Sequence, residues 1–262
     1  MLLFTLALAC KDPVDADSVG LEDGNAEAPT DLNSLTAFMF REWDNEDSSV
    51  LAAGLENIES IAADYPVDET NFANRSFEGI QALTTEDVSD VELTHGYNPE
   101  DAGGVGLYLQ SQFSVDDHVG LFTMADQMPI EPGSPDFYDR TITDGETCFP
   151  AKECDTMTSE NDIGRRNFLV DTEQQTIKVW RWVELDDGRM AVAGRTWQPA
   201  LADSEKEDKI YQNYSVEVWI PNDSGTLRFI TTWSENSFEF ADALIIGSVN
   251  DAFKACEDYL TE

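Results

Sequence analysis

Apolar residues recur at helical spacing in two segments of the N-terminal third of the chain. Asp31 is a suitable N-cap for the first segment, because its carboxylate can accept a hydrogen bond from a free backbone N–H of the first turn. The apolar residues are Leu32, Leu35, Met39 and Trp43 in the first segment, and Leu51, Leu55, Ile58, Ile61 and Tyr65 in the second. This spacing predicts one helix from Asp31 and another from Ser48 to Tyr65, which together form a helical hairpin.

Strict alternation of apolar with small or polar residues begins at Val105 and continues to Phe113. This pattern is typical of a strand with one buried face. Ser114 follows as an N-cap, so a short helix is expected directly after the strand. The stretch 66–104 is poorly patterned, and only one short helix capped by Thr85 is expected there.

From Tyr138 onward, the chain carries a series of short runs rich in β-branched and aromatic residues. The turns at 186–188 and 221–225 are short and contain Gly with Asp or Asn, so the strands that they join should be antiparallel. The expected strands are 138–143, 176–185, 190–197, 211–220 and 226–234. A final amphipathic helix has an apolar stripe formed by Ile245, Val249, Ala252, Phe253, Cys256, Tyr259 and Leu260.

These elements predict an α+β fold in which an antiparallel sheet wraps on a long C-terminal helix and is preceded by the N-terminal helical hairpin. We divide the chain into a leader at 1–9, an acidic disordered tether at 10–30 and a single domain at 31–262. Within the domain, 31–104 is the helical part and 105–262 holds the sheet and the C-terminal helix.

Three stretches of the C-terminal half carry a family resemblance: WRWVELDDGRMAVAGRTWQ, YSVEVWIPNDSGTLRFITTW and ADALIIGSVNDAFKACEDYL. In their order and patterning they resemble the second half of a helix-grip domain of the START and polyketide-cyclase type. In that superfamily a curved antiparallel sheet wraps the C-terminal helix, and a hydrophobic cavity between them often holds a lipid, sterol or polyketide. The resemblance implies a cavity for a hydrophobic or amphiphilic ligand.

The stretch MLLFTLALAC at the start is a short apolar run that ends in small residues before Cys10 and then turns polar. It resembles the lipobox of bacterial lipoproteins. In that family the leader is cut before the cysteine, which is acylated, so the resemblance implies export and a lipid anchor on Cys10. Lys11 would then be the second mature residue, which by the same resemblance favours the outer over the inner membrane. A frayed apolar N-terminus or an uncleaved leader is the alternative.

The charge of the chain excludes some classes of partner. A formal net charge of -38 makes binding to nucleic acid or to an anionic membrane surface electrostatically unfavourable. Between Lys11 and Asp31, seven acidic residues accompany one basic residue, and large apolar residues are almost absent. A segment of this composition buries too little apolar surface to fold by itself, which predicts the tether.

The cysteines agree with export. Cys148 and Cys154 stand close together in CFPAKEC and are expected to form a disulfide, with two free thiols as the alternative. A metal site is not expected, because no further Cys or His lies at ligand spacing. Cys256 falls on the apolar stripe of the last helix, where it is expected to be a buried packing residue.

Candidate catalytic residues are few. His118 stands beside Asp116 and Asp117, but adjacent residues on a helix point in different directions, so a charged helix start is the simpler interpretation. Asp223-Ser224-Gly225 matches the core motif of aspartic proteases, yet that mechanism needs two such carboxylates and the chain has one copy, so we interpret it as a hairpin turn. No catalytic residue, metal or cofactor is expected.

The aromatic residues give the remaining indication of function. Trp180 and Trp182 share one face of their strand, and Val179 and Val183 share the other. A strand that is apolar on both faces is usually buried on both, so ordinary core is one interpretation. The other is that one face lines a cavity that orients an amphiphile with an acidic head. The residues proposed for this cavity are Trp180, Trp182, Arg195, Trp197, Tyr214 and Trp233.

The register of one hairpin decides whether Arg195 reaches Trp180. A two-residue turn at Asp187-Gly188 pairs the two residues directly, whereas a bulge at Gly188 moves Arg195 to the opposite face. Both turns suit the sequence.

Two functions follow. The first is an exported, lipid-anchored and non-catalytic module of the cell envelope that binds a lipid or other hydrophobic or amphiphilic small molecule in a helix-grip cavity. The alternative is a structural or interaction lipoprotein of the cell envelope with no ligand cavity. The acidic start, the first helix SLTAFMFREWDNED and the C-terminal half are also similar to uncharacterised lipoproteins of myxobacterial type, which imply no function.

Overall fold

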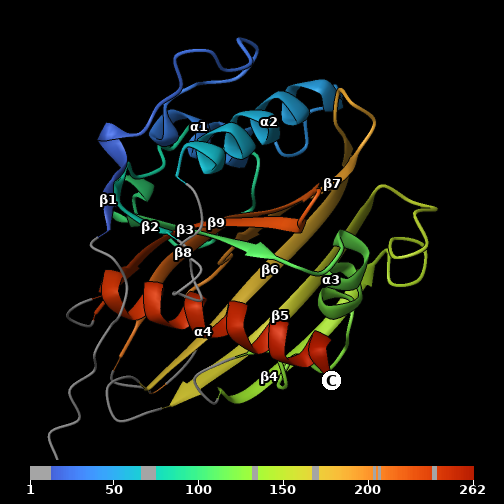
Figure 1. Cartoon of the computed structure of the whole chain (residues 1–262). Helices are drawn as coiled ribbons and strands as arrows, with labels where there is room; N and C mark the ends of the chain where they lie inside the picture. Colours follow the sequence, from blue (N-terminus) through green and yellow to red (C-terminus); the bar gives the residue numbers. More distant parts are fainter. Residues whose placement is uncertain are drawn as a thin grey trace, which may run out of the picture.

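A curved sheet forms the middle layer of the computed structural model, with helices α1 and α2 on one face and α3 and α4 on the other (Figure 1). The structure describes residues 13–65, 75–131, 135–166, 171–202, 205, 208–237 and 241–262. The α-helices are α1 (Leu32–Arg41), α2 (Ser48–Asp64), α3 (Val115–Phe122) and α4 (Ala241–Thr261), and short 3-10 helices span Ala16–Ser18 and Pro99–Asp101. The strands are β1 (Val14–Asp15), β2 (Arg75–Ile80), β3 (Gly103–Ser111), β4 (Pro135–Asp144), β5 (Thr156–Arg166), β6 (Asp171–Glu184), β7 (Met190–Trp197), β8 (Ile210–Asn222) and β9 (Gly225–Asn236).

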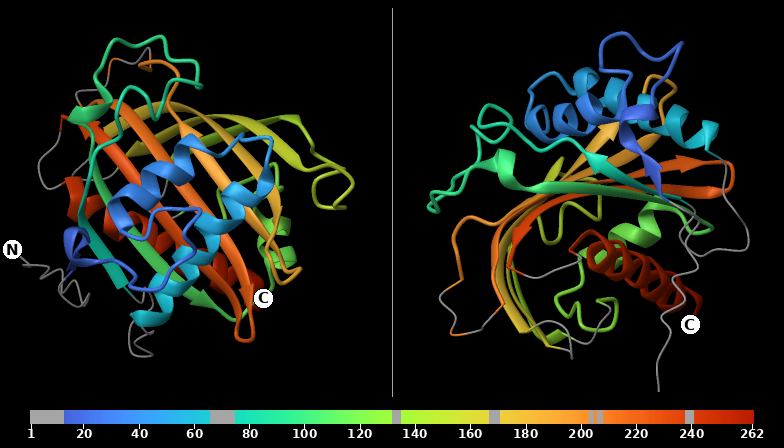
Figure 2. Two further views of the ribbon diagram at one scale, coloured as in Figure 1. Left: turned by 90° about the horizontal axis from the view of Figure 1, so that it is seen from above. Right: turned by 90° about the vertical axis from the view of Figure 1, so that its left-hand side faces the viewer.

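The sheet has the strand order β1-β2-β3-β9-β8-β7-β6-β5-β4. Neighbouring strands are antiparallel except for β1 and β2, which pair in parallel. The sheet bends so that its concave face surrounds α4 (Figure 2). This is a helix-grip arrangement, and it confirms the expected α+β class with an antiparallel sheet wrapped on the C-terminal helix.

Helices α1 and α2 form the expected hairpin on the convex face. Asp31 caps α1 by accepting a hydrogen bond from the backbone N–H of Ser34 at 2.9 Å. The two helices cross closely at Gly54, where a Cβ would lie 2.3 Å from the sulfur of Met39. The apolar faces of both helices join the inward side chains of the convex face in one core cluster. This packing holds the helical layer on the sheet.

Helix α3 begins at Ser114 with a capping box, in which Ser114 and Asp117 each satisfy a backbone N–H of the other. Helix α4 packs Ile246 and Phe253 on the apolar residues of β3, while Cys256 packs on the segment after α3. Tyr259 was expected on the buried stripe but is 41% exposed. Helices α3 and α4 therefore cover the concave face of the sheet.

Strands β1, β2 and β5 lie where no strand was expected. Strand β5 faces the concave side with Ser159 and Asn161, which are polar but buried, so its sequence lacks the apolar alternation of a strand. Strand β2 falls in the poorly patterned stretch and carries a register shift between Phe77 and Ile80. The short helix expected at Thr85 is a run of turns instead.

The acidic segment before α1 packs on the domain from residue 13 onward, in contrast to the disordered tether expected at 10–30. Ala16, Val19 and Ala28 are buried, and β1 extends the sheet beside β2. The side chain of Asn57 on α2 accepts a hydrogen bond from the backbone N–H of Asn25 at 2.7 Å and donates to the carbonyl of Pro29 at 3.0 Å. These contacts supply the stabilisation that composition alone did not indicate. Cys10 and the leader lie outside the described residues.

Candidate functional site

The sheet separates the residues that were proposed to line one cavity. Trp180 and Trp182 project from the concave face, where they pack with α3. Trp197, Tyr214 and Trp233 belong to the core cluster on the α1–α2 side. The structure therefore brings these aromatic residues together in two groups, not one.

The hairpin between β6 and β7 explains this separation. Trp180 pairs with Gly194, and Arg195 pairs with Val179, so Arg195 and Trp180 lie on opposite faces. Gly188 adopts a positive φ of 83°, a conformation that glycine tolerates and that shifts the register by one residue. Of the two turns that suit the sequence, the chain uses the one that moves Arg195 away from Trp180.

Arg195 holds the helical layer on the sheet. Its side chain is 5% exposed, and its guanidinium carbon lies 5.4, 5.1 and 5.5 Å from the ring centroids of Phe40, Trp43 and Trp197. Its Nη1 donates to the carbonyl of Phe40 at 3.1 Å and to the carboxylate of Asp90. This cation is enclosed by core residues, and its contacts hold α1 and the segment after it on the sheet.

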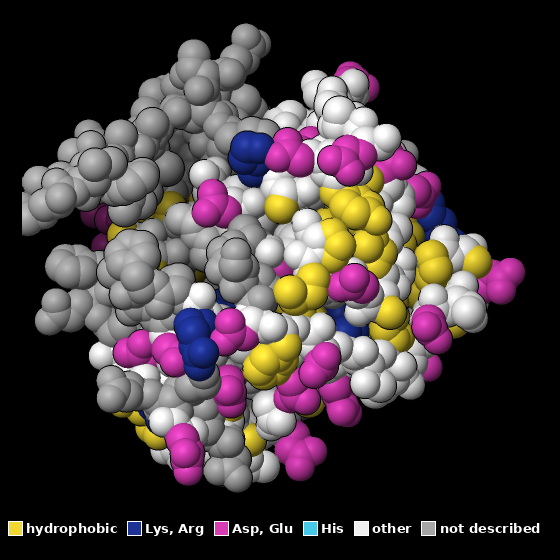
Figure 3. Space-filling view, turned by 90° about the horizontal axis from the view of Figure 1, so that it is seen from below, with side chains coloured by type: hydrophobic (Ala, Val, Ile, Leu, Met, Phe, Trp, Pro, Cys, Tyr) yellow, Lys and Arg dark blue, Asp and Glu magenta, His cyan; other side chains and the backbone are white. Residues whose placement is uncertain are grey.

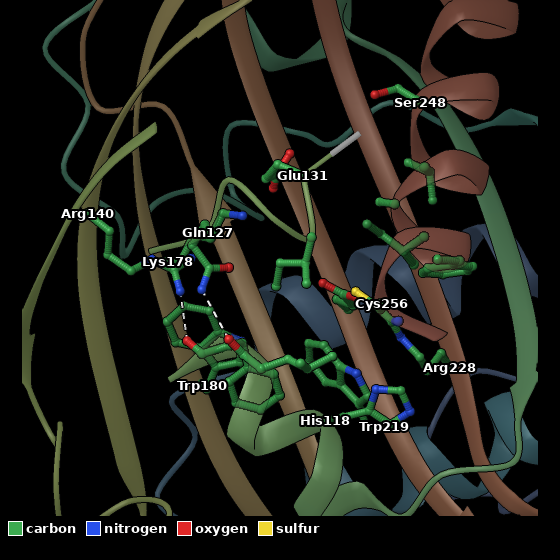
Figure 4. A pocket seen from close by; sticks show the side chains of 18 of the residues that line it. His118, Gln127, Glu131, Arg140, Lys178, Trp180, Trp219, Arg228, Ser248 and Cys256 are labelled. Carbon is green, nitrogen blue, oxygen red and sulfur yellow. Dashed lines mark hydrogen bonds and ion pairs between the residues drawn. The ribbon is translucent and has the colours of Figure 1, made fainter. Parts of the chain in front are cut away.

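A cavity of about 180 Å³ lies on the other face, between the concave side of the sheet, α3 and α4 (Figure 4). Its apolar wall comes from α3, from the segment that follows it, from α4 and from the tryptophans of β6 and β8. Of the residues proposed from the sequence, Trp180 lines it. The apolar wall residues are Leu121, Phe122, Ile130, Trp180, Trp219, Ile230, Val249, Ala252 and Phe253.

Charged side chains also line this cavity. Arg228 projects from β9 and is 5% exposed; its Nη2 donates to Glu217 at 2.8 Å. Its guanidinium carbon lies 4.3 Å from the ring centroid of Phe253 and 5.8 Å from that of Trp219. Among the described residues, Arg228 Nε and Nη1 and Trp219 Nε1 have no hydrogen-bond partner. Buried N–H donors without partners cost free energy, and a bound acceptor would satisfy them.

A second charged group surrounds Glu131. Its carboxylate accepts a hydrogen bond from Arg165 Nη2 at 2.6 Å. Burial alone would raise the pKa of Glu131, but the positive charges of Arg165, Lys178 and Arg140 outweigh it and leave the pKa below its usual range. Glu131 is therefore ionised at neutral pH.

Arg140 is fixed in place beside this group. It donates to Asn161 Oδ1 at 2.8 Å, to the carbonyl of Phe122 at 2.7 Å and to the hydroxyl of Tyr138 at 3.1 Å. Its hydrogen bonds join the edge strand β4 to the end of α3, so Arg140 shapes the cavity wall and carries a fixed positive charge.

His118 at the cavity wall is neutral. It is 1% exposed, and burial together with the charge of Arg228 lowers its pKa to about 2. Its Nε2 lies 2.9 Å from Ser111 Oγ and 3.8 Å from Glu257 Oε1. In a catalytic triad the acid orients the histidine through its other nitrogen, and the serine is accessible to substrate. Here both groups meet the same nitrogen and Ser111 is fully buried, so the three residues join β3, α3 and α4 structurally.

The other candidate catalytic and metal residues have structural roles. Asp117 belongs to the capping box of α3, and Asp116 forms an exposed ion pair with Lys152. Asp223-Ser224-Gly225 connects β8 to β9 as a hairpin turn, as expected. In the described ranges, no cluster of three His, Cys, Asp or Glu residues could hold a metal ion, and no helix is long and apolar enough to span a membrane.

The expected disulfide between Cys148 and Cys154 is present, with Cα atoms 5.3 Å apart. It closes a loop whose Phe149 is fully buried and stacks on Trp182 with 5.5 Å between ring centroids. The indole Nε1 of Trp182 donates to the carbonyl of Phe149 at 3.0 Å. The disulfide thus holds Phe149 against the concave face, next to the cavity wall. Cys256 is a buried free thiol, as expected, and burial raises its pKa although Arg228 opposes the rise.

Sequence reasoning missed all six charged residues that line the cavity. A signal was present in the sequence, because each basic residue stands two positions from an apolar residue of the same strand face. Lys178 shares the inward face of β6 with Trp180, and Arg228 shares the inward face of β9 with Ile230. A basic residue at an inward position of a strand is unusual in a chain with 15 basic and 53 acidic residues. Acidic side chains are spread over the surface around this side of the molecule, and hydrophobic ones gather in part of it (Figure 3).

No family model and no curated protein match the sequence. Solved structures with a similar arrangement include the STAR-related lipid transfer protein fragment from Xanthomonas axonopodis, with a TM-score of 0.46 and 11% identity over 62% of this chain and 88% of that one. Norcoclaurine synthase from Thalictrum flavum has a TM-score of 0.36 and 10% identity over 62% of this chain and 87% of that one. Ara h 8.0201 has a TM-score of 0.35 and 8% identity over 61% of this chain and 95% of that one. Likenesses this distant say nothing of a ligand, so function is inferred from the cavity.

Proposed function

We propose that this protein is a non-catalytic module that binds a hydrophobic or amphiphilic small molecule between the concave face of the sheet, α3 and α4. The observation that carries the proposal is the cavity of about 180 Å³, which combines an apolar wall with buried N–H groups of Arg228 and Trp219 that no described residue satisfies. A mostly apolar concavity with a few convergent polar groups is the usual form of a small-molecule site.

The volume of the cavity limits the size of the ligand. Small-molecule sites usually enclose about 300–1,000 Å³, whereas an engineered cavity of about 150 Å³ binds benzene. At about 180 Å³, the cavity admits an aromatic ring with a small substituent or a short aliphatic chain. A lipid with long acyl chains would need α4 to move away from the sheet.

Among the described residues that line the cavity, the histidine and the two glutamates are engaged in other contacts. His118 is neutral and is held by Ser111 on the buried side of the wall. Glu131 and Glu217 each pair with an arginine, so neither is an available base. Binding is therefore the function that the site supports best.

The binding proposal is tested with two matched substitutions on α4. Ala252 lines the cavity, whereas Ala243 is exposed on the same helix. Ala252→Leu should fill part of the cavity and weaken binding of a small apolar probe such as toluene or hexanamide at least tenfold, and Ala243→Leu should leave it unchanged. Binding is measured by isothermal titration calorimetry, with circular dichroism to confirm that both variants fold. Equal affinities of both variants, or no binding of any probe to the unmodified protein, would favour the structural lipoprotein instead.

We also propose that the protein is exported and anchored by a lipid on Cys10, with the outer membrane as its location. The lipobox-like start of the sequence supports this. Lys11 and Asp12 alone separate Cys10 from the first described residue, Pro13, and an extended chain spans at most about 3.3–3.6 Å per residue. The anchor would therefore hold the domain close to the membrane, with Cys10 within about 14 Å of the start of β1 at Val14.

The anchor is tested by fractionating cells that produce the protein with its native leader. Cys10→Ser should move the folded protein from the membrane fraction to the soluble fraction, and Cys256→Ser should not. A Cys10→Ser protein that stays on membranes after a high-salt wash would refute the anchor.

A further inference from the structure

Basic residues are concentrated at the cavity, against the character of the whole chain. The chain has 15 basic and 53 acidic residues, but four basic and two acidic residues line the cavity. These lining groups leave a positive balance of two charges, because Glu131 is ionised and Glu217 pairs with Arg228. In a site with low water content, such a balance attracts an anion strongly. The basic residues of the cavity are Arg140, Arg165, Lys178 and Arg228.

Arg228 is placed to bind an oxyanion directly. Its ion pair with Glu217 uses Nη2, while Nε and Nη1 have no oxygen acceptor among the described residues, and the thiol of Cys256 is the other polar neighbour of the guanidinium. The side chain of Arg228 is 6% exposed and its guanidinium lies on the ring of Phe253, so its direction is fixed. Trp219 Nε1 is a further buried donor without a described partner. In Figure 4, Arg228 and Trp219 lie toward the same end of the cavity.

Lys178 adds a further positive charge at the cavity wall. Its ammonium group lies 5.8 Å from the ring centroid of Tyr138, and it has neither a hydrogen bond nor an ion pair with a described residue. It is half-buried and lines the cavity from β6. An unpaired ammonium at a cavity wall lowers the free energy of an anion inside it.

We infer that the ligand of this cavity is a small amphiphilic carboxylic acid, with its carboxylate on Arg228 and Trp219 and its apolar body against Phe122, Ile130 and Val249. The inference rests on the proposed function and adds the chemical class of the ligand. A carboxylate brings two acceptor oxygens to the buried N–H donors of Arg228 and Trp219.

The charge preference is tested with pairs of acids and neutral isosteres. Hexanoate against hexanamide, and benzoate against benzamide, are titrated into the whole chain at pH 7 and low salt by calorimetry. We expect each acid to bind at least tenfold more tightly than its amide, with a preference that shrinks as salt is added. If acid and amide bind equally, the inference fails and the proposed binding function stands. If neither binds, both fail.

Substitutions of Lys178 and Arg228, with one at Lys254 as the control, identify the positive charge that attracts the acid. Lys178→Met should weaken hexanoate several-fold and leave hexanamide unchanged, whereas Lys254→Met, on the exposed side of α4, removes the same charge and should change neither. Arg228→Gln should abolish the preference for the acid, and Arg228→Lys should restore part of it. Equal effects of Lys178→Met and Lys254→Met would overturn the assignment, because binding would then follow net charge alone.

A spectroscopic test addresses the contact itself. The indole N–H resonance of Trp219, assigned by loss of its signal in Trp219→Phe, should shift downfield on addition of hexanoate as it gains an acceptor. An indole signal of Trp219 that does not move while hexanoate binds would place the carboxylate elsewhere.

Discussion

Replacing Arg195 with methionine tests whether this cation holds the helical layer or contacts a ligand. The side chain is almost fully buried among Phe40, Trp43 and Trp197, and it donates to the carbonyl of Phe40 and to Asp90. Methionine keeps much of the apolar stem and removes the guanidinium. The variant therefore loses the charged hydrogen bonds and the cation–π contacts with little change in packing.

The expected loss of stability follows from the burial of Arg195 and of Asp90, its partner in the ion pair. Hydrogen bonds to charged groups contribute about 1.5–3 kcal/mol, and breaking a fully buried ion pair costs about 3–5 kcal/mol. Asp90 is 29% exposed, so water recovers part of the lost interaction and the cost falls toward the lower end. We expect the free energy of unfolding to fall by about 2–4 kcal/mol, which corresponds to a Tm about 5–15 °C lower.

Urea unfolding followed by circular dichroism measures this change. A double-mutant cycle with Asp90→Asn should give a coupling energy of about 1–2 kcal/mol. Lys178→Met is the control, because it removes a half-buried cation without hydrogen bonds from the opposite face and should change stability by less than about 0.5 kcal/mol. An Arg195→Met variant of unchanged stability that has lost affinity for hexanoate would refute the reasoning and return Arg195 to the ligand site.

Three further predictions concern the concave side. Replacing Cys148 and Cys154 with serine should lower the free energy of unfolding by about 2 kcal/mol, as urea unfolding under non-reducing conditions would show, since the loop is short. The folded pKa of His118 is about 2 and its unfolded pKa about 6.5, so only the unfolded state gains the proton as pH falls below 6.5. Stability should then drop by at most about 1.4 kcal/mol per pH unit, and urea unfolding between pH 7 and 4.5 should give a smaller slope for His118→Asn. The Cys256 thiol has a raised pKa and is buried, so it should react with a thiol reagent at pH 8 more slowly by orders of magnitude in the folded than in the urea-unfolded protein; equal rates would contradict its burial.

The elements that the sequence predicts well are those in which burial and periodicity coincide. Helices α1 and α2 bury one apolar face each, and short turns join β6 to β7 and β8 to β9. Strand β5 is not predicted from the sequence, because the polar residues Ser159 and Asn161 occupy inward positions where a strand usually has apolar ones. Asn161 is satisfied there by Tyr138, Arg140 and the carbonyl of Thr176. Such compensation depends on residues far along the chain, which local pattern does not show.

The prediction of a disordered segment before α1 is wrong for a related reason. Its composition predicts a disordered tether, but Ala16, Val19 and Ala28 are enough to pack it once α2 supplies Asn57 as a hydrogen-bonding partner. The stabilisation comes from tertiary contacts and not from the segment itself.

The candidate site could be predicted only in part. The sequence indicates an aromatic strand with a nearby cation, and Trp180 does line the cavity. A register shift of one residue at Gly188 decides on which face of the sheet Arg195 lies. The sequence of the turn does not determine whether that shift occurs. Arg228 is one of the cations that line the cavity instead; it comes from another strand and meets α4 only in the folded chain.

The position of a bound acid tests the central claim most directly. Intermolecular nuclear Overhauser effects between hexanoate and the methyl groups of the protein report which residues the aliphatic chain touches. Contacts with Leu121, Ile130 and Val249, which line the cavity, are the predicted result. Contacts with Leu55 and Ile58 on the α1–α2 side, or none to either face, would contradict a ligand site between the sheet and α4.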